Sequence, residues 1–307
     1  MSGKNARRES ARQALFSGKL DTEGMEDVLA LYRDLFELTE KTPTLVRDKK
    51  ELTSDEARMR LAEGFALIDP GDLLPAPEKM AAMVKDVVQI LGRHSEDPGA
   101  LMEDMANLTT ETARLNDLAR TFLTEGEGAL RKELLLIQGA NPEVVTFVLF
   151  NALKGSFLFA AGRCESIDIS AWEKGSCPVC GGEPAVGYVM GEGGKRYLIC
   201  FRCETHWRFK RLTCPYCDHE SPKETGFLYS EDADYKTLSA GVCNECQAYI
   251  KGWRIEGDDL GDMHPEVEDL KTPGFDRAVE EEGFSRGAPN IYGVWIGTMA
   301  EEGGNLG

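Results

Sequence analysis

The sequence has no long uninterrupted apolar run of the kind that crosses a membrane. Its most apolar stretch, Val144–Phe150, spans seven residues and is soon followed by Asn151 and Lys154. A membrane helix needs about 20 mostly apolar residues, so we expect no membrane span. The first residues contain Arg7 and Arg8 with no apolar core behind them. They therefore do not match a secretory or twin-arginine signal, and we expect a cytoplasmic location.

Groups typical of catalysis are also scarce. The sequence supports no Ser/His/Asp arrangement, and its one glycine-rich stretch, 191–194, fits a hairpin turn better than a phosphate-binding loop. We therefore expect no enzyme active site. The histidines are scattered, and we expect them at the surface or beside cysteines without a ligand role; they are His94, His206, His219 and His264.

Basic residues are outnumbered by acidic ones. The 307 residues include 35 Lys and Arg against 53 Asp and Glu, a formal net charge of −18. Residues 256–307 alone carry 3 basic and 13 acidic side chains, whereas residues 177–255 carry 10 of each. Such an acidic protein repels a phosphate backbone unless it has a local basic face. Nucleic-acid binding is therefore disfavoured, although the neutral middle segment keeps it open.

The length and the 42% apolar content predict at least two folding units. Residues 1–23 are polar, and we expect a flexible or partly helical arm. For residues 24–165, apolar spacings of three and four predict an all-helical domain. The expected helices start near Met25, at Thr53 with a capping box, near Pro77, at Asp97-Pro98, after Gly126, and at Asn141-Pro142. The last, running to about Arg163, is apolar on most sides and should be the central buried helix.

After Cys164 the pattern changes to short alternating strands with glycine-rich turns. Two β-modules are expected, over residues 166–212 and 213–256, with Trp207, Tyr249 and Trp253 in their cores. The remaining residues, 257–307, read as an acidic tail with one short helix near 270–282.

Eight of the nine cysteines form four CxxC pairs within seventy residues. Without an export signal a disulfide framework is not expected, because the cytosol keeps thiols reduced. The first two pairs are separated by 19 residues and the last two by 25, which is one hairpin each, whereas only 10 separate the inner pairs. This spacing predicts two four-thiolate metal sites in chain order: Cys177, Cys180, Cys200 and Cys203 in the first, and Cys214, Cys217, Cys243 and Cys246 in the second. Cys164 has no partner in spacing and should be a buried thiol at a helix end.

A metal ion explains how such small modules fold. Each has about 35–40 residues, too few for a sufficient core, and a structural zinc is worth roughly 10–16 kcal/mol in peptides. Four sulfurs suit zinc or iron, and the sequence does not distinguish them. A basic cluster nearby offsets the thiolate charge, or alternatively forms a partner-docking or nucleic-acid face; its members are Lys195, Arg196, Arg202, Arg208, Lys210 and Arg211.

Four segments carry a resemblance to a known family: CPVCGGEP at 177–184, YLICFRCETHWRFKRLTCPYCD at 197–218, GVCNECQAYIK at 241–251 and EEGFSRGAPN at 281–290. Together with the helical first half, they resemble the bacterial formate dehydrogenase accessory proteins of the FdhE type. The resemblance implies a non-catalytic assembly factor in the cytoplasm, acting on the catalytic subunit of formate dehydrogenase before export. It also implies an all-helical N-terminal domain, two rubredoxin-like or zinc-ribbon modules, and iron at the two cysteine sites.

The leading hypothesis is therefore a client-binding protein with metal-clamped β-modules. One alternative is a nucleic-acid-binding zinc-ribbon protein, which predicts salt-sensitive binding through the basic cluster. The other is a rubredoxin-type electron carrier, which predicts a reversible iron couple and visible thiolate-to-iron absorption. The sequence leaves the oligomeric state open.

Overall fold

The computed structural model describes residues 3–16, 26–41, 52–95, 105, 111–137, 139–230, 235–261 and 263–294. The chain divides into two compact units. The first contains residues 1–20, 52–67 and 163–301, and the second contains residues 21–51, 68–162 and 302–307. The division differs from the boundaries expected from the sequence, because two N-terminal segments join the unit that carries the cysteines.

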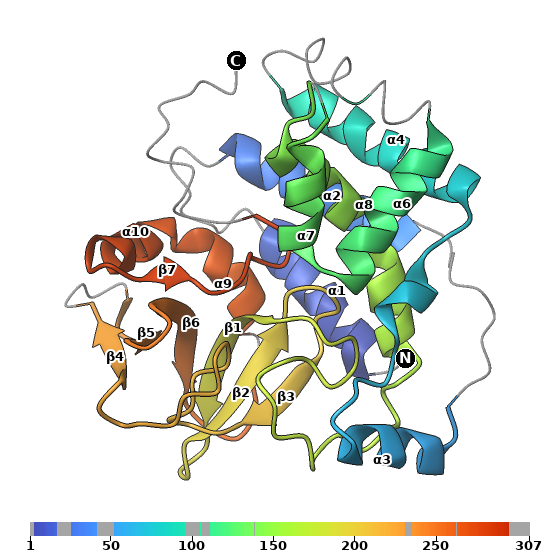
Figure 1. The fold of residues 1–307 in the computed structure, drawn as a ribbon. Helices are drawn as coiled ribbons and strands as arrows, with labels where there is room; N and C mark the ends of the chain where they lie inside the picture. Colours follow the sequence, from blue (N-terminus) through green and yellow to red (C-terminus); the bar gives the residue numbers. More distant parts are fainter. Residues whose placement is uncertain are drawn as a thin grey trace. The chain divides into compact units, whose positions relative to one another are not determined.

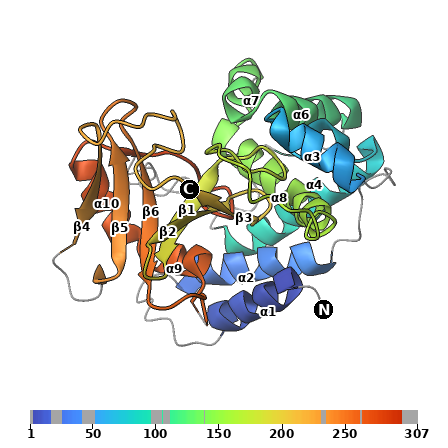
Figure 2. The same cartoon turned by 90° about the horizontal axis from the view of Figure 1, so that it is seen from below.

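The second unit is helical. Its elements are α2 (Glu26–Lys41), the 3-10 helix η1 (Pro70–Leu73), α4 (Pro77–His94), α6 (Thr112–Thr124), α7 (Glu127–Leu134) and α8 (Pro142–Gly162), seen from below in Figure 2. Helix α8 packs against α2, α4, α6 and α7, and α4 packs against α2 and α6. The expected start of a helix at Asp97-Pro98 lies outside the described residues.

Helix α8 is the core helix of this unit, as its sequence predicts. The Asn141 side chain accepts hydrogen bonds from the backbone N–H groups of Glu143 and Val144, which caps the first turn. Among the described residues, α8 is the one helix that is long and apolar enough to cross a membrane by length and composition. However, 78% of its apolar window is buried inside the protein, which is the environment of a core helix.

The first unit is built around one mixed sheet. Its strands are β1 (Pro184–Met190), β2 (Lys195–Cys200), β3 (His206–Phe209), β4 (Thr225–Tyr229), β5 (Leu238–Cys243), β6 (Ala248–Ile255) and β7 (Ser285–Arg286). The order is β3-β2-β1-β6-β5-β4, with β7 paired to β6, and Figure 1 shows β4, β5 and β6 side by side. The expected hairpin about residues 191–194 is present, since Val189 pairs with Arg196 across it.

The two expected β-modules are joined through parallel pairing of β1 and β6. Val186 lies opposite Lys251, and the register continues to Met190 opposite Ile255. Each module thus contributes three strands to one sheet, and the two are not separate ribbons in tandem. The parallel pair brings together segments about 65 residues apart in sequence, which local alternation does not reveal.

The polar N-terminal segment forms a helix, α1 (Gly3–Phe16), which packs against the C-terminal helix α9 (Pro265–Lys271). Arg7 donates a hydrogen bond to the Met263 carbonyl at 3.1 Å, and Ser10 Oγ lies 2.9 Å from His264 Nε2. The same unit includes α3 (Ser54–Ala62), which begins after Thr53 with the predicted capping box.

Residues 265–292 are part of the core of this unit, and not a surface tail. The one expected helix is two, α9 and α10 (Pro273–Glu281), because Pro273 has no N–H and begins a new first turn. Both lie against the sheet region in Figure 1. Their inner face is apolar, with Val267, Leu270, Phe275 and Val279 buried.

Buried charges attach this segment to the sheet. Lys251 on β6 contacts Asp269 and Asp276, and Arg286 on β7 contacts the same two carboxylates at 2.7 and 3.1 Å. The Tyr249 hydroxyl donates to Asp276 at 2.8 Å. Two cations therefore neutralise two acids of the segment, which explains how so acidic a stretch can be buried.

Candidate metal centres

The structure gathers the eight CxxC sulfurs into two groups of four. Within each group all four sulfurs lie within 4.8 Å of one another. In the first, Cys177 Sγ is 3.6 Å from Cys203 Sγ and Cys180 Sγ is 3.5 Å from Cys200 Sγ. In the second, the Cys214–Cys246 and Cys217–Cys243 sulfur pairs are each 3.7 Å apart.

These distances fit a metal ion and do not fit disulfides. Sulfurs about 2.3 Å from a zinc ion at the centre of a tetrahedron are about 3.8 Å apart, whereas bonded sulfurs are about 2.05 Å apart. All nine cysteines are free thiols. Each group can therefore hold one ion, and tetrahedral sulfur coordination suits zinc or iron.

The backbone after each CxxC pair adopts the left-handed region. Gly181 has φ +74°, and the described residues with positive φ other than glycine are Glu204, Asp218 and Gln247, at 55°, 57° and 57°. Each follows the second cysteine of its pair. Side chains with a Cβ are strained in this region, which only glycine adopts freely. The sequence indicates this turn at Gly181 and, more loosely, at Asp218; at Glu204 and Gln247 it carries no glycine, yet the same turn forms.

Three of the four turns share one hydrogen-bond pattern, which includes a 3.1 Å bond from the Glu204 N–H to the Cys200 carbonyl. The N–H of the residue after the pair donates to the carbonyl of the first cysteine, at 2.9 Å for Gly181 to Cys177, and at 3.0 Å for Asp218 to Cys214. The Val179 N–H also points at the Cys177 sulfur, 3.4 Å away. Such N–H groups stabilise a thiolate, so the turns suit metal-bound sulfur.

The two sites differ in access to solvent. All four cysteines of the first site are completely buried. In the second site Cys214 and Cys243 are buried, whereas Cys217 and Cys246 reach the surface. An ion in the second site would therefore be reached by chelators and oxidants far more readily.

Burial also acts on the thiol pKa values. It raises the pKa of Cys177 and Cys200 well above that of an ordinary thiol, and that of Cys246 to about 11. Partial burial alone raises the pKa of Cys243, but hydrogen bonds from the backbone N–H groups of Cys246 and Glu245 lower it overall. Without an ion Cys177, Cys200 and Cys246 keep their protons at neutral pH, and metal binding would release them.

Segments distant in sequence support the first site. The Leu67 N–H donates to the Pro178 carbonyl at 2.9 Å, which attaches the segment after α3 to the Cys177–Cys180 turn. Arg8 on α1 forms an ion pair with Glu204 at 3.1 Å, directly after Cys203. The sequence carries no signal for either contact, because the partners are more than 100 residues apart.

The second site is supported by Arg196 on β2. Its guanidinium donates to the carbonyls of Lys210, Arg211 and Thr213, which fixes the chain leading into Cys214. Burial lowers the pKa of Arg196 to about 10, so it stays cationic at neutral pH. Its role is thus in holding the site, and it is not available to a surface ligand.

The remaining members of the basic cluster differ in pairing and exposure, and Lys195 is exposed. Lys210 pairs with Glu220 at 2.7 Å, and the Arg202 guanidinium lies 5.3 Å from the Phe201 ring centroid. Arg208 and Arg211 are exposed. The structure therefore does not favour a continuous nucleic-acid surface of these residues.

The expectations for single residues have mixed outcomes. Trp207, Tyr249 and Trp253 are buried core residues, and Cys164 is buried just after α8, as predicted. His264 is buried and contacts Ser10, which contradicts the expected surface position. His206 Nδ1 lies 3.1 Å from the Tyr188 hydroxyl, and His94 Nε2 lies 2.9 Å from Asp34.

Comparison with known proteins bears directly on the cysteine-bearing segment. The family model described as the FdhE central domain matches residues 176–211, and the FdhE C-terminal domain model matches residues 212–292. These two adjoining matches contain all eight CxxC cysteines in both sites. Residues 176–292, which carry both cysteine groups, match the FdhE family. Similarity to FdhE thus covers every strand of the sheet, together with α9 and α10.

Individual relatives carry the same name. A protein FdhE homolog of Aquifex aeolicus (strain VF5) is 28% identical over 172 residues, which cover 53% of this chain and 59% of the relative. A protein FdhE homolog of Stutzerimonas stutzeri (strain A1501) is 33% identical over 122 residues, 38% of this chain and 37% of the relative. The matches to these curated relatives thus span less than two thirds of their length.

A solved structure has the same fold. The crystal structure of the FdhE protein from Pseudomonas aeruginosa superposes with a TM-score of 0.59, at 21% identity, over 94% of both chains. The likeness of fold therefore extends beyond the FdhE domains matched in sequence and includes helical regions.

Proposed function

We propose that this chain is a cytoplasmic, non-catalytic accessory factor in the maturation of formate dehydrogenase. In this role it binds the catalytic subunit of that enzyme before export. The observation that supports the proposal most directly is the match of residues 176–292 to the two FdhE domains, with both four-cysteine clusters inside it.

The eight cysteines are proposed as the metal ligands. Cys177, Cys180, Cys200 and Cys203 would hold one ion, and Cys214, Cys217, Cys243 and Cys246 the other. An ion bound by four thiolates would close each pair of turns and hold the strand ends that carry them. The burial of the first site suits a structural role, and the greater exposure of the second makes its ion more easily exchanged.

A test of client binding uses the full chain with an affinity tag and the purified catalytic subunit of formate dehydrogenase from the same genome. Both are handled anaerobically at low salt, and binding is measured by biolayer interferometry. We expect saturable binding by the metal-loaded protein. Absence of binding by protein that carries two ions per chain would contradict the proposal.

Metal analysis of the same sample separates the remaining alternatives. A reversible iron couple with thiolate-to-iron absorption would support a rubredoxin-type electron carrier. Zinc-loaded protein that binds the subunit with full affinity would restrict the ions to a structural role. Salt-sensitive binding to DNA or RNA without binding to the subunit would favour the nucleic-acid alternative.

A further inference from the structure

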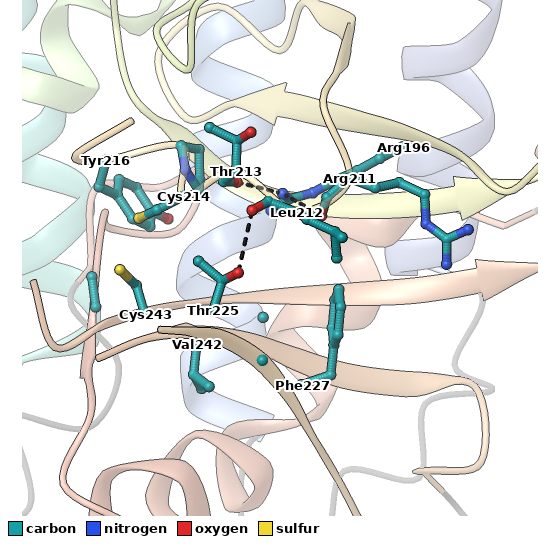
Figure 3. A pocket seen from close by; sticks show the side chains of 14 residues that line it. Arg196, Arg211, Leu212, Thr213, Cys214, Tyr216, Thr225, Phe227, Val242 and Cys243 are labelled. Atoms are coloured by element: carbon teal, nitrogen blue, oxygen red, sulfur yellow. Dashed lines mark hydrogen bonds between the residues drawn. The ribbon is translucent and has the colours of Figure 1, made fainter. Parts of the chain in front are cut away.

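A pocket adjoins the second cysteine site. It contains about 330 Å³, including solvent at its mouth, and lies between strands β4 and β5 and the segment 211–216. Figure 3 shows Cys214 and Cys243 at one end and Arg211 and Phe227 at the other. Gly241 lies opposite Phe227 in the β4–β5 register and has no side chain, which leaves this part of the sheet face open.

Strand β4 forms an edge of the sheet beside this pocket. Among the described residues, β5 is its only strand partner. Alternate backbone N–H and C=O groups on the other side of β4 can therefore receive another strand. Strand β4 contains neither a proline nor a charged side chain, so it lacks two of the common protections of a free edge.

Exposed apolar side chains follow this edge. Phe227 and Tyr229 are 38% and 67% exposed, and both point to the same face because they are two residues apart. Their ring centroids are 6.3 Å apart. Leu212, which is 49% exposed, adds a third apolar side chain from the facing segment. Its carbonyl accepts a hydrogen bond from Thr225 Oγ1, which holds that segment beside the start of β4 (Figure 3).

Two arginine side chains lie at the pocket, although the whole chain is strongly acidic. Arg196 and Arg211 are the charged side chains among the pocket residues. Arg196 is used in hydrogen bonds to three backbone carbonyls. Arg211 is exposed, and its guanidinium forms no ion pair within the described part of the chain. A bound segment with an acidic side chain would supply that missing partner at the end of the pocket away from the cysteines.

We propose that the β4 edge, defined by Leu212, Phe227, Tyr229 and Arg211, binds an extended segment of the formate dehydrogenase catalytic subunit. The segment adds a strand beside β4, with apolar side chains over Phe227 and Tyr229 and an acidic side chain at Arg211. Main-chain hydrogen bonds supply affinity in such strand addition, and the alternate side chains supply specificity. The inference rests on the proposed function and names the surface that performs it.

The test compares Tyr229→Asp and Arg211→Glu with two matched controls. The controls are Leu136→Asp, at an exposed leucine of the helical unit, and Arg208→Glu, at an exposed arginine on β3. Affinity for the purified catalytic subunit is measured for each full-length protein, after metal content and circular dichroism show that it is folded. We expect each edge variant to weaken binding by about tenfold or more, and each control by less than about twofold. Raising the salt concentration should narrow the difference in affinity for the subunit between wild type and Arg211→Glu.

Each result has a distinct meaning. Failure of the wild type to bind would contradict the proposed function itself. Wild-type binding that both edge variants retain would overturn the β4 edge while leaving the function in place. Analytical ultracentrifugation tests whether a second copy of this chain occupies the edge instead. A wild-type dimer that Tyr229→Asp dissociates, with unchanged affinity for the subunit, would assign the edge to a second copy and overturn the proposal.

Discussion

Lys251 Nζ lies 2.8 Å from Asp269 Oδ1, and both side chains are buried. The pair joins strand β6, which ends the second cysteine module, to helix α9 of the C-terminal segment. Lys251 also contacts Asp276, so its ammonium group pairs with two carboxylates. Arg286 is the second cation that contacts Asp276.

Replacing Lys251 should destabilise the first unit strongly. Lys251→Met leaves two buried carboxylates with Arg286 alone, and we expect the free energy of unfolding to fall by about 3–5 kcal/mol in urea titrations. Lys271→Met is the matched control, since Lys271 pairs with Glu268 at the surface, and its effect should be below about 1 kcal/mol. Adding Asp276→Asn to Lys251→Met should restore part of the loss. Equal effects of Lys251→Met and Lys271→Met would contradict the importance of the buried network.

The contribution of Asp269 should depend on pH. Burial alone raises the pKa of Asp269, but the charges of Arg286 and Lys251 lower it overall below the ordinary aspartate value. Its stabilisation is therefore present above about pH 4 and is lost as the pH falls through the lowered folded-state pKa.

Urea titrations of wild type and Asp269→Asn at several pH values test this dependence. The difference in unfolding free energy should be constant from about pH 7 to 5 and should narrow below about pH 4. Acid loss of metal affects both proteins, so the difference isolates the carboxylate. If the difference in unfolding free energy between wild type and Asp269→Asn widened as the pH fell, Asp269 would be protonated in the folded protein at neutral pH.

The second cysteine site should lose its metal first. Cys217 and Cys246 reach the surface, whereas all four cysteines of the first site are buried. With excess chelator at neutral pH, we expect one ion per chain to leave rapidly and the other slowly. The metal that remains bound is measured over time by inductively coupled plasma mass spectrometry. A thiol reagent should then label four cysteines in the fast phase.

Single substitutions assign the phases. Cys246→Ser should remove the fast phase of metal release and leave the slow one. Cys203→Ser should remove the slow phase and leave the fast one, and it should lower the free energy of unfolding more than Cys246→Ser does. Release of both ions in one phase from the wild type would show that the difference in exposure does not govern metal loss.

A side chain at Gly175 should lower the stability of the protein. A Cβ at this position would lie 1.9 Å from the Pro215 carbonyl oxygen, so the backbone would have to move next to the Cys214–Cys217 turn. We expect Gly175→Ala to lower the free energy of unfolding by about 1–3 kcal/mol. Gly193→Ala, where a Cβ meets nothing within 4 Å, is the control and should change stability by less than about 0.5 kcal/mol. A Gly175→Ala melting curve that matches the control would contradict the close approach.

Local sequence patterns predicted most of the individual elements. The capping box at Thr53, the cap at Asn141 and the alternation of residues 248–255 are signals within one element, and α3, α8 and β6 form where they indicate. The grouping of cysteines followed from loop lengths alone. The single helix predicted near 270–282 was wrong, because Pro273 lacks an N–H and divides it, a local signal that the prediction did not use.

Contacts between distant segments were beyond such patterns. The hydrogen bond from Leu67 to Pro178 and the pair of Arg8 with Glu204 join residues more than 100 positions apart. No local pattern around any of these four residues indicates a partner. For the same reason the acidic residues after 257 suggested a solvated tail.

The sequence by itself determined how the eight cysteines group and where most helices and strands form, because these depend on spacing within a few turns or one hairpin. Only the tertiary structure decided that β1 pairs with β6 and that the C-terminal acids are buried. Pairing depends on which edges meet, and a buried carboxylate is stable only where a cation from elsewhere in the chain reaches it, as Lys251 reaches Asp269.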